Sequence, residues 1–293
     1  NGVAANDYSG KSVSAAGDIN GDGTVSPVEQ NAVVADRTAG KNINWDYSEF
    51  SYSLGANFLL NDDNAIFARA SHGIRANADR KVGSADNAGN LEDAELFDEV
   101  DQFELGYKFN GDVIDLFVTG FYAETQLSSF DFTRPAGDQQ LDKEYEVLGV
   151  ELEFGTDIGP VGIDGSVTWT DAEIKDSLNA AVIGNTPRRQ ADFVYQATAQ
   201  YDDGFFKAGA NLIGTTDSFT QDSNQLKLPE YAQVNAYLAV RPVDRVEVAL
   251  NANNLFNSEG YTEAEEGSIP ANGIVRARSI AGRTIAASVR FEF

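Results

Sequence analysis

The chain has 293 residues, carries a formal net charge of −25 and contains no cysteine. The missing cysteines exclude a disulfide framework and a thiolate metal site. Nucleic acid is disfavoured as a partner, because no basic stripe offsets the acidic charge. No apolar run reaches the 18 or so residues of a membrane helix. The slightly negative mean hydropathy still allows membrane strands, which expose only every second residue to lipid.

The first residues contain no secretory leader, since Asn1 opens directly into polar sequence. A protein that leaves the cytoplasm needs such a leader. We therefore expect this sequence to be a mature fragment or a part of a longer chain.

From Trp45 to Phe293 apolar and polar residues alternate, which predicts strands with one apolar and one polar face. We expect about eleven antiparallel strands of roughly ten residues each, the class of tilted membrane strands. Their approximate ranges are 45–60, 64–74, 97–109, 112–125, 143–155, 160–172, 190–202, 204–216, 230–241, 244–256 and 279–293.

The connections between these segments alternate in length. Short ones lie at 61–63, 110–111, 156–159, 203 with its neighbours and 242–243, where Asn-Gly and Asp-Asp-Gly sequences favour tight turns. Long ones cover 75–96, 126–142, 173–189, 217–229 and 257–278. This alternation, with aromatic residues near strand ends, is typical of an outer-membrane β-barrel with short periplasmic turns and long outer loops.

An odd number of strands has a consequence for the whole protein. A single-chain bacterial barrel has an even number, so that both ends face the periplasm. Eleven strands that end in the periplasm must begin outside. We therefore expect residues 1–44 to form an extracellular loop and residues 45–293 to form barrel strands, with an N-terminal portion missing from this chain.

The alternation also predicts which residues meet lipid and which face the lumen. The apolar set should face lipid: Phe50, Phe58, Val161, Trp169, Val246, Val248, Ile285 and Val289. The polar set should face the lumen: Ser53, Asn57, Thr168, Asn251, Thr284 and Ser288. A register error of one residue would exchange the two sets.

Residues 18–29 match the twelve-residue EF-hand calcium loop. The expected ligands are Asp18, Asn20, Asp22, the Thr24 carbonyl, Ser26 and Glu29, the last bidentate. Gly23 stands at the sharp bend, and hard oxygen ligands suit Ca²⁺. Ser26 and Pro27 predict the start of a short exiting helix. The alternative is an Asp- and Gly-rich turn without a metal.

Other chemistry is less well specified. His72, the single histidine, is expected at a strand end, as a rim or lumen residue. Five basic residues could line a lumen: Arg69, Arg75, Lys108, Arg188 and Arg189. One histidine and no cysteine leave most nucleophile–base arrangements without a base, so we do not expect an enzyme.

Five segments, taken in order, resemble the TonB-dependent outer-membrane receptor family. They are SLGANFLLNDDNAIFARASHGIRAN (53–77), VDQFELGYKF (100–109), GVELEFGTDIGPVGIDGSVTWTDAEI (149–174), VALNANNLFNSEGY (248–261) and GRTIAASVRFEF (282–293). The resemblance implies an all-β transmembrane antiparallel barrel, of which this chain forms the C-terminal part of 22 strands around a plug. The plug and the TonB-contacting segment belong to the N-terminal half, so none of their residues can be named here.

The resemblance further implies active uptake of a scarce nutrient across the outer membrane, energised by TonB. Its partners would be outer-membrane lipid, the missing plug and barrel portion, TonB through that portion, and a surface lipoprotein. The family carries ferric chelates, cobalamin, oligosaccharides and peptides, and the aromatic and acidic loops slightly favour an uncharged or cationic ligand such as a glycan. The alternatives are a passive or adhesive barrel and a secreted calcium-binding β-protein.

Overall fold

The computed structural model describes residues 22–27, 48–76, 97–130, 140–264 and 273–292. The chain divides into two compact units. One consists of Asn1–Phe50, Ile74–Glu99 and Leu127–Asp142, and the other of Ser51–Gly73, Val100–Gln126 and Lys143–Phe293. In the described ranges, no helix has both the length and the apolar character needed to cross a bilayer.

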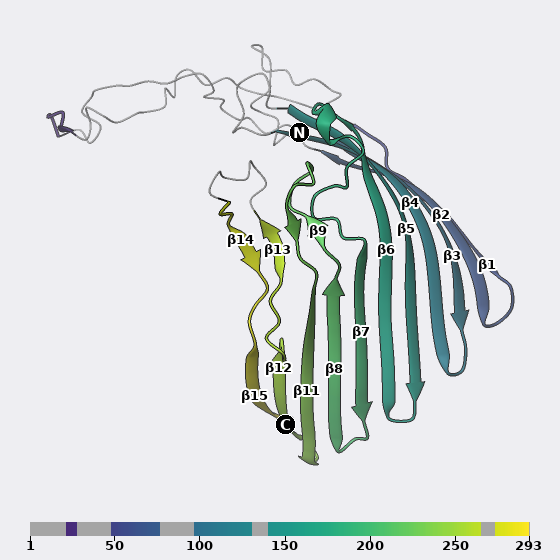
Figure 1. Ribbon diagram of the computed structural model, residues 1–293. Helices are drawn as coiled ribbons and strands as arrows, with labels where there is room; N and C mark the ends of the chain where they lie inside the picture. The colour runs from purple at the N-terminus through teal and green to yellow at the C-terminus, as the bar shows by residue number, and fades with distance from the viewer. Residues whose placement is uncertain (1–21, 28–47, 77–96, 131–139, 265–272, 293) are drawn as a thin grey trace. The chain divides into compact units, whose positions relative to one another are not determined.

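Within these described ranges, eleven strands form one sheet, in which neighbours follow chain order (Figure 1). They are β1 (Tyr52–Leu59), β2 (Asn64–Ala76), β3 (Phe97–Asn110), β4 (Ile114–Phe130), β5 (Gln140–Ile158), β6 (Val161–Ser177), β7 (Phe193–Asp202), β8 (Phe206–Thr215), β11 (Tyr231–Val243), β12 (Val246–Asn253) and β15 (Thr284–Phe291). Two small antiparallel pairs lie in the connections: β9 (Ser218–Phe219) with β10 (Lys227–Leu228), and β13 (Tyr261–Ala264) with β14 (Ala277–Ser279). A single 3-10 turn, η3 (Ala180–Val182), is described between β6 and β7.

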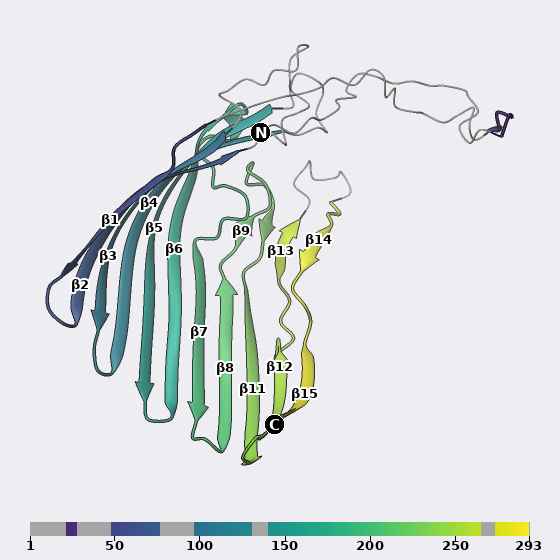
Figure 2. The same ribbon diagram turned by 180° about the vertical axis from the view of Figure 1, so that it is seen from behind.

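Short and long connections lie at opposite ends of the strands, as Figures 1 and 2 show for β6 to β15. At the turn end, Gly159 and Gly204 adopt left-handed φ values of 59° and 92°. The Asp203 carboxylate accepts hydrogen bonds from the backbone N–H groups of Phe205 (3.0 Å) and Phe206 (2.7 Å). These are tight turns between β5 and β6 and between β7 and β8. The loop end carries η3 and both small β-pairs.

The pairing register gives the sheet one apolar and one polar face, because residues opposite each other in an antiparallel pair point to the same side. An apolar row crosses six strands through Ile163, Ala199, Ala210, Ala236, Ala252 and Ile285. The adjacent polar row crosses four strands through Asp164, Thr198, Asn211 and Asn235. The expected separation of lipid-facing from lumen-facing side chains is therefore confirmed for β6 to β15.

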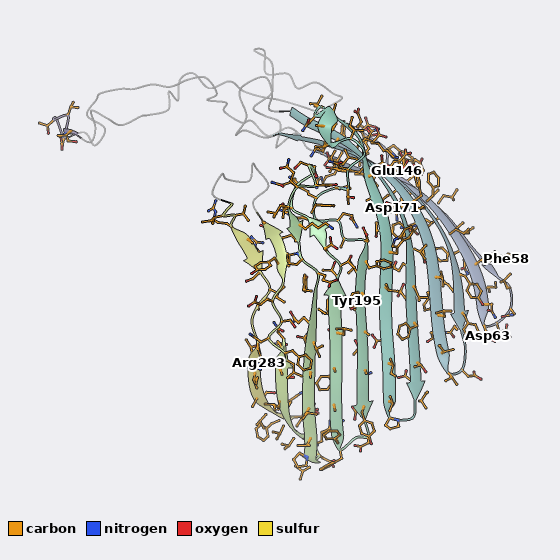
Figure 3. All side chains as sticks on the ribbon, viewed as in Figure 1. Phe58, Asp63, Glu146, Asp171, Tyr195 and Arg283 are labelled. Carbon is orange, nitrogen blue, oxygen red and sulfur yellow. The ribbon has the colours of Figure 1, made fainter. Side chains whose placement is uncertain are left out.

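The apolar face forms a band of limited height. On β6 it runs from Val161 to Trp169, nine residues, and the next position on that face is Asp171. On β5 it runs from Ile158 to Leu148, and the next position is Glu146. Figure 3 places Glu146 and Asp171 toward the loop end, well away from Asp63 at the turn end. About nine to eleven tilted residues cross a bilayer, so β5 and β6 continue beyond it.

The strand ends are where the sequence prediction is wrong. β4, β5 and β6 have 17, 19 and 17 residues, not about ten. Their ladders continue past the apolar band because nothing in water forces a paired backbone to stop at the lipid boundary. β1 begins at Tyr52 rather than at Trp45, so Phe50 lies outside a strand. β7 and β15 are also shorter than expected.

Glycines on the polar face make room for aromatic rings of the neighbouring strand. A Cβ at Gly149 would lie 2.2 Å from the Phe121 ring, and one at Gly209 would lie 2.5 Å from the Tyr237 ring. Since neither approach is sterically allowed, these rings can occupy their positions beside the neighbouring strand only because glycine is there.

Replacement of Val289 by Arg should lower the free energy of unfolding of the full-length protein in lipid by roughly 2–4 kcal/mol, the cost of a charge near mid-membrane. Val289 lies opposite Val248 on the apolar face, where a charge would meet acyl chains. Ser288→Arg is the matched control, at the same depth on the polar face. Denaturant unfolding in phospholipid vesicles measures both variants, and equal costs would show that the two faces are misassigned.

Candidate functional site

A cluster of polar side chains at the loop end centres on Asp222. Its carboxylate forms an ion pair with the Lys143 ammonium, and the two side chains are only 9% and 14% exposed. Its second oxygen accepts the backbone N–H of Arg188 at 2.9 Å. The cluster joins β5 to two connections, residues 178–192 between β6 and β7 and residues 216–230 between β8 and β11. We call it the Asp222 cluster.

Two asparagines complete the Asp222 cluster. The Asn185 amide donates to the Asp222 carbonyl at 2.8 Å. The Asn224 side chain accepts the backbone N–H of Thr186 at 3.1 Å and donates to the carbonyl of the same residue at 2.8 Å. Asn224 has a φ of 53°, which asparagine tolerates better than most residues. Side chains of each loop thus bind the backbone of the other.

The pKa of the Asp222 carboxyl reflects opposing effects. Burial acts to raise the pKa. The hydrogen bonds from Lys143 and from the Arg188 backbone, together with the charges of Lys143 and Arg188, outweigh burial and hold the pKa below its usual value. Asp222 therefore stays ionised at neutral pH, as the ion pair requires.

A second chain of charges extends from the same loops. Arg189 donates its backbone N–H to the Phe219 carbonyl at 2.6 Å. Its guanidinium lies 3.8 Å from Glu263 of β13, and Glu263 also pairs with Arg278 of β14 at 3.4 Å. The β13–β14 hairpin is thus linked electrostatically to the β6–β7 loop. Most of these groups are well exposed, so this link is weaker than the Asp222 cluster.

The residues that were singled out from the sequence have separate surroundings. Arg69 pairs with Glu104 at 2.8 Å, and the Lys108 ammonium lies 4.7 Å from the centre of the Phe67 ring. In the other compact unit, the Arg75 Nε donates to Asp98 at 3.0 Å. These contacts are separate from one another, and the expectation that the five basic residues line a lumen stays a prediction.

His72 pairs through Nδ1 with Asp101 at 3.0 Å and stacks on Tyr52 at 5.5 Å between ring centres. Tyr52 lies directly opposite His72 in the β1–β2 pair. Phe58 and Ile66 lie opposite each other on the same side of that pair. His72 therefore lies on the side of the apolar residues, which contradicts a lumen position and leaves the rim.

Three of the six expected calcium ligands, Asp18, Asn20 and Glu29, lie outside the described residues. Of the remainder, Asp22 accepts hydrogen bonds from the Thr24 backbone N–H (2.8 Å) and hydroxyl (2.7 Å). Gly23 has a φ of 83°. No group of three or more His, Asp or Glu side chains suited to a metal occurs among the described residues, and the calcium site stays a prediction.

Residues 16–255 match the family described as TonB dependent receptor-like, beta-barrel. The match covers every strand of the large sheet except β15. The chain belongs to the TonB-dependent receptor family. The resemblance that the five sequence segments suggested is therefore confirmed, together with the all-β barrel fold.

Relatives of this receptor chain agree with that assignment. It is 23% identical over 254 residues to the pesticin receptor of Yersinia enterocolitica, a match that covers 82% of this chain and 35% of that protein. The ferric yersiniabactin uptake receptor FyuA from Yersinia pestis is similar in structure, with a TM-score of 0.70 and 18% identity over 87% of this chain and 39% of that one. The siderophore receptor PiuA from Acinetobacter baumannii gives 0.69 and 18%, over 88% and 38%.

The chain therefore spans about a third of the length of the pesticin receptor. At these identities the likeness to solved structures shows the fold. A TonB-dependent receptor barrel is integral to the outer membrane, so the apolar face meets lipid and the polar face meets the lumen. We expect the loop end, with its long connections, to be the outer side, which would place the Asp222 cluster at the outer mouth.

The Asp222 cluster should loosen only in acid. The folded-state pKa of Asp222 lies below the unfolded value of about 3.9. Its stabilisation is therefore complete above that value and is lost as the pH falls through the folded-state pKa. Amide exchange in residues 183–190 and 219–226, corrected for intrinsic rates, should be constant from pH 8 to 5 and accelerate below about pH 4. A transition near pH 6.5 would point to a histidine instead.

Proposed function

We propose that the full-length protein takes up a scarce nutrient actively across the outer membrane, with energy delivered by TonB. The observation that carries the proposal is the match of residues 16–255 to the TonB-dependent receptor barrel. The polar inner face supports it, since a lumen lined by amides, hydroxyls and carboxylates is compatible with a polar plug and a polar solute. The activity is transport, and we assign no catalytic step to this chain.

The two edge strands of the sheet indicate that the barrel has a further portion. β1 and β15 are the outer strands of the described sheet and each has one described neighbour in it. In lipid an open strand edge leaves backbone groups without hydrogen bonds, which is very costly. We propose that further strands of the same protein pair with both edges, and that a plug in the same portion contacts TonB.

The substrate class can be narrowed only by analogy. FyuA is a ferric yersiniabactin uptake receptor, and PiuA is a siderophore receptor. FecA, another protein of similar fold, is a ferric citrate transporter, with a TM-score of 0.70 and 15% identity. Ferric chelates are therefore the first probes to use, with a neutral oligosaccharide as the second.

Cells that express the full-length protein should accumulate at least one labelled ferric chelate or oligosaccharide only when TonB is present and the inner membrane is energised. A protonophore should abolish accumulation, because the inner membrane is then no longer energised and the plug blocks passive flow. The control is the same strain without TonB. Equal entry of small solutes with and without TonB would favour a passive porin and contradict the proposal.

We also propose a structural calcium site at residues 18–29, in the expected outer loop. Gly23 has the left-handed φ that a sharp bend at this position needs, and Asp22 and Thr24 are in contact, so the described residues fit such a loop. Asp18, Asn20, Asp22, Ser26 and Glu29 would supply side-chain oxygens, and Thr24 a carbonyl. A bound Ca²⁺ would order the loop by mass action, and the ordered loop could meet substrate or a surface lipoprotein.

Asp18→Ala with Glu29→Ala should leave the barrel intact but expose residues 10–40 to protease. In the parent protein, calcium should slow cleavage there relative to a chelator, because the ion binds only the folded loop. The double variant should be cleaved rapidly in both conditions. Equally slow cleavage of the parent protein with calcium and with chelator would contradict the site.

A further inference from the structure

The β6–β7 and β8–β11 loops are joined by directional bonds in both senses. Asp222 of the second loop accepts the Arg188 N–H of the first, and Asn185 of the first donates to the Asp222 carbonyl. Asn224 binds both backbone groups of Thr186. Because each bond needs both loops in place, separation of the loops would break all of them together.

The ion pair ties these loops to the barrel wall. Lys143 belongs to β5, and its ammonium meets the Asp222 carboxylate with both side chains largely buried. Removal of one partner would leave the other charge buried without compensation, which is far more damaging than loss of a surface pair. The same β8–β11 connection contains a surface pair for comparison, Asp217 with Lys227, whose side chains are 46% and 59% exposed.

The β6–β7 loop is also hydrogen-bonded to the end of β6. The Ile174 N–H of β6 donates to the Asn185 carbonyl at 2.9 Å, and the Gly184 N–H donates to the Ile174 carbonyl at 2.8 Å. Ile174 is fully buried. The β6–β7 loop is therefore folded back onto its own strand at the residue where it meets Asp222.

We infer that the Asp222 cluster makes the β6–β7 and β8–β11 loops one rigid segment of the outer rim, so that neither loop opens without the other. The inference rests on the proposed function only in placing this rim at the mouth through which substrate enters. A rim fixed in advance presents its surface to a ligand without the entropic cost of ordering two loops. Asp222 is in this sense a positioning residue for the mouth.

Amide exchange of the full-length protein in detergent tests the inference without any substrate. Lys143→Met should accelerate exchange in residues 183–190 and 219–226 together, by at least about tenfold, because the buried carboxylate loses its counter-charge. Exchange in β8 and β11 should not change. Lys143→Arg keeps the charge and should restore slow exchange. Asp217→Asn is the matched control and should leave both loops unchanged, since an exposed pair contributes little.

Acceleration confined to one loop would show that the loops open independently and would overturn the inference. Unchanged exchange in Lys143→Met would overturn it as well, because the ion pair would then hold nothing. Neither result depends on transport, so failure here is distinct from failure to find TonB-dependent uptake.

A tether gives an independent reading, because the chain has no cysteine of its own. Arg189→Cys with Phe219→Cys places one thiol in each loop, at residues whose backbones are bonded at 2.6 Å. A short bis-maleimide should join them and change exchange in either loop by less than about twofold, since a rigid segment has little motion to lose. Strong slowing by the tether, relative to the same double variant capped with a monofunctional maleimide, would mean that the loops normally separate.

Discussion

The constraint on which this structure depends is that every backbone N–H and C=O group in a bilayer must be paired within the protein. A sheet in which neighbouring strands follow chain order satisfies it with short turns at one end. Because side chains alternate along each strand, the same ladder gives one face to lipid and the other to the lumen. Tyr195 (Figure 3) and Ala197 on the apolar side alternate with Gln196 and Thr198 on the polar side of one strand. A single strand thus presents apolar side chains to lipid and polar side chains to the lumen.

The backbone pairing of the strands continues beyond the bilayer, where lipid no longer requires it. On β6 the lipid-facing positions end at Trp169, yet Asp171, Glu173 and Lys175 continue the same column in water. Glu173 and Lys175 pair with each other at 2.9 Å, and Lys175 also reaches Glu146 at 3.0 Å. Part of the barrel wall therefore extends beyond the membrane. The thickness of the bilayer does not determine where the β6–β7 loop begins.

Periodicity predicted the number of strands in the large sheet and the facing of their side chains, because those properties depend on local alternation. It did not predict where strands end in water, since no change in alternation marks the boundary beyond Ser177 on β6. The Asp222 cluster could not be predicted either. Lys143 and Asp222 are 79 residues apart in sequence, and Asp222 is one of 46 acidic residues. Asp-Ser-Asn at 222–224 looks like an ordinary turn until another loop is placed against it.

A motif that carried the family resemblance has a structural explanation. Asn254, in the Asn-Asn-Leu-Phe-Asn run, is almost fully buried and has a φ of 48°. Its amide donates to the carbonyls of Ser258 (2.9 Å) and Ala281 (3.0 Å), and its oxygen accepts the Ser258 N–H at 2.8 Å. It thereby connects the end of β12 to the approach to β15. Only a short side chain with donors and an acceptor can do this, and an isosteric Leu would leave buried carbonyls without partners.

The same reasoning explains why a buried ion pair lies at the loop end of so acidic a chain. Apolar contacts could hold two loops together equally well in free energy, and a buried ion pair often adds no more than a hydrophobic pair of equal volume. Hydrophobic contact, however, is non-directional, and loops held only by it could slide. Asp222 accepts from Lys143 and from the Arg188 N–H through different oxygens, so its position is fixed relative to both β5 and the β6–β7 loop. The resulting geometry is therefore specific, although the stabilisation is ordinary.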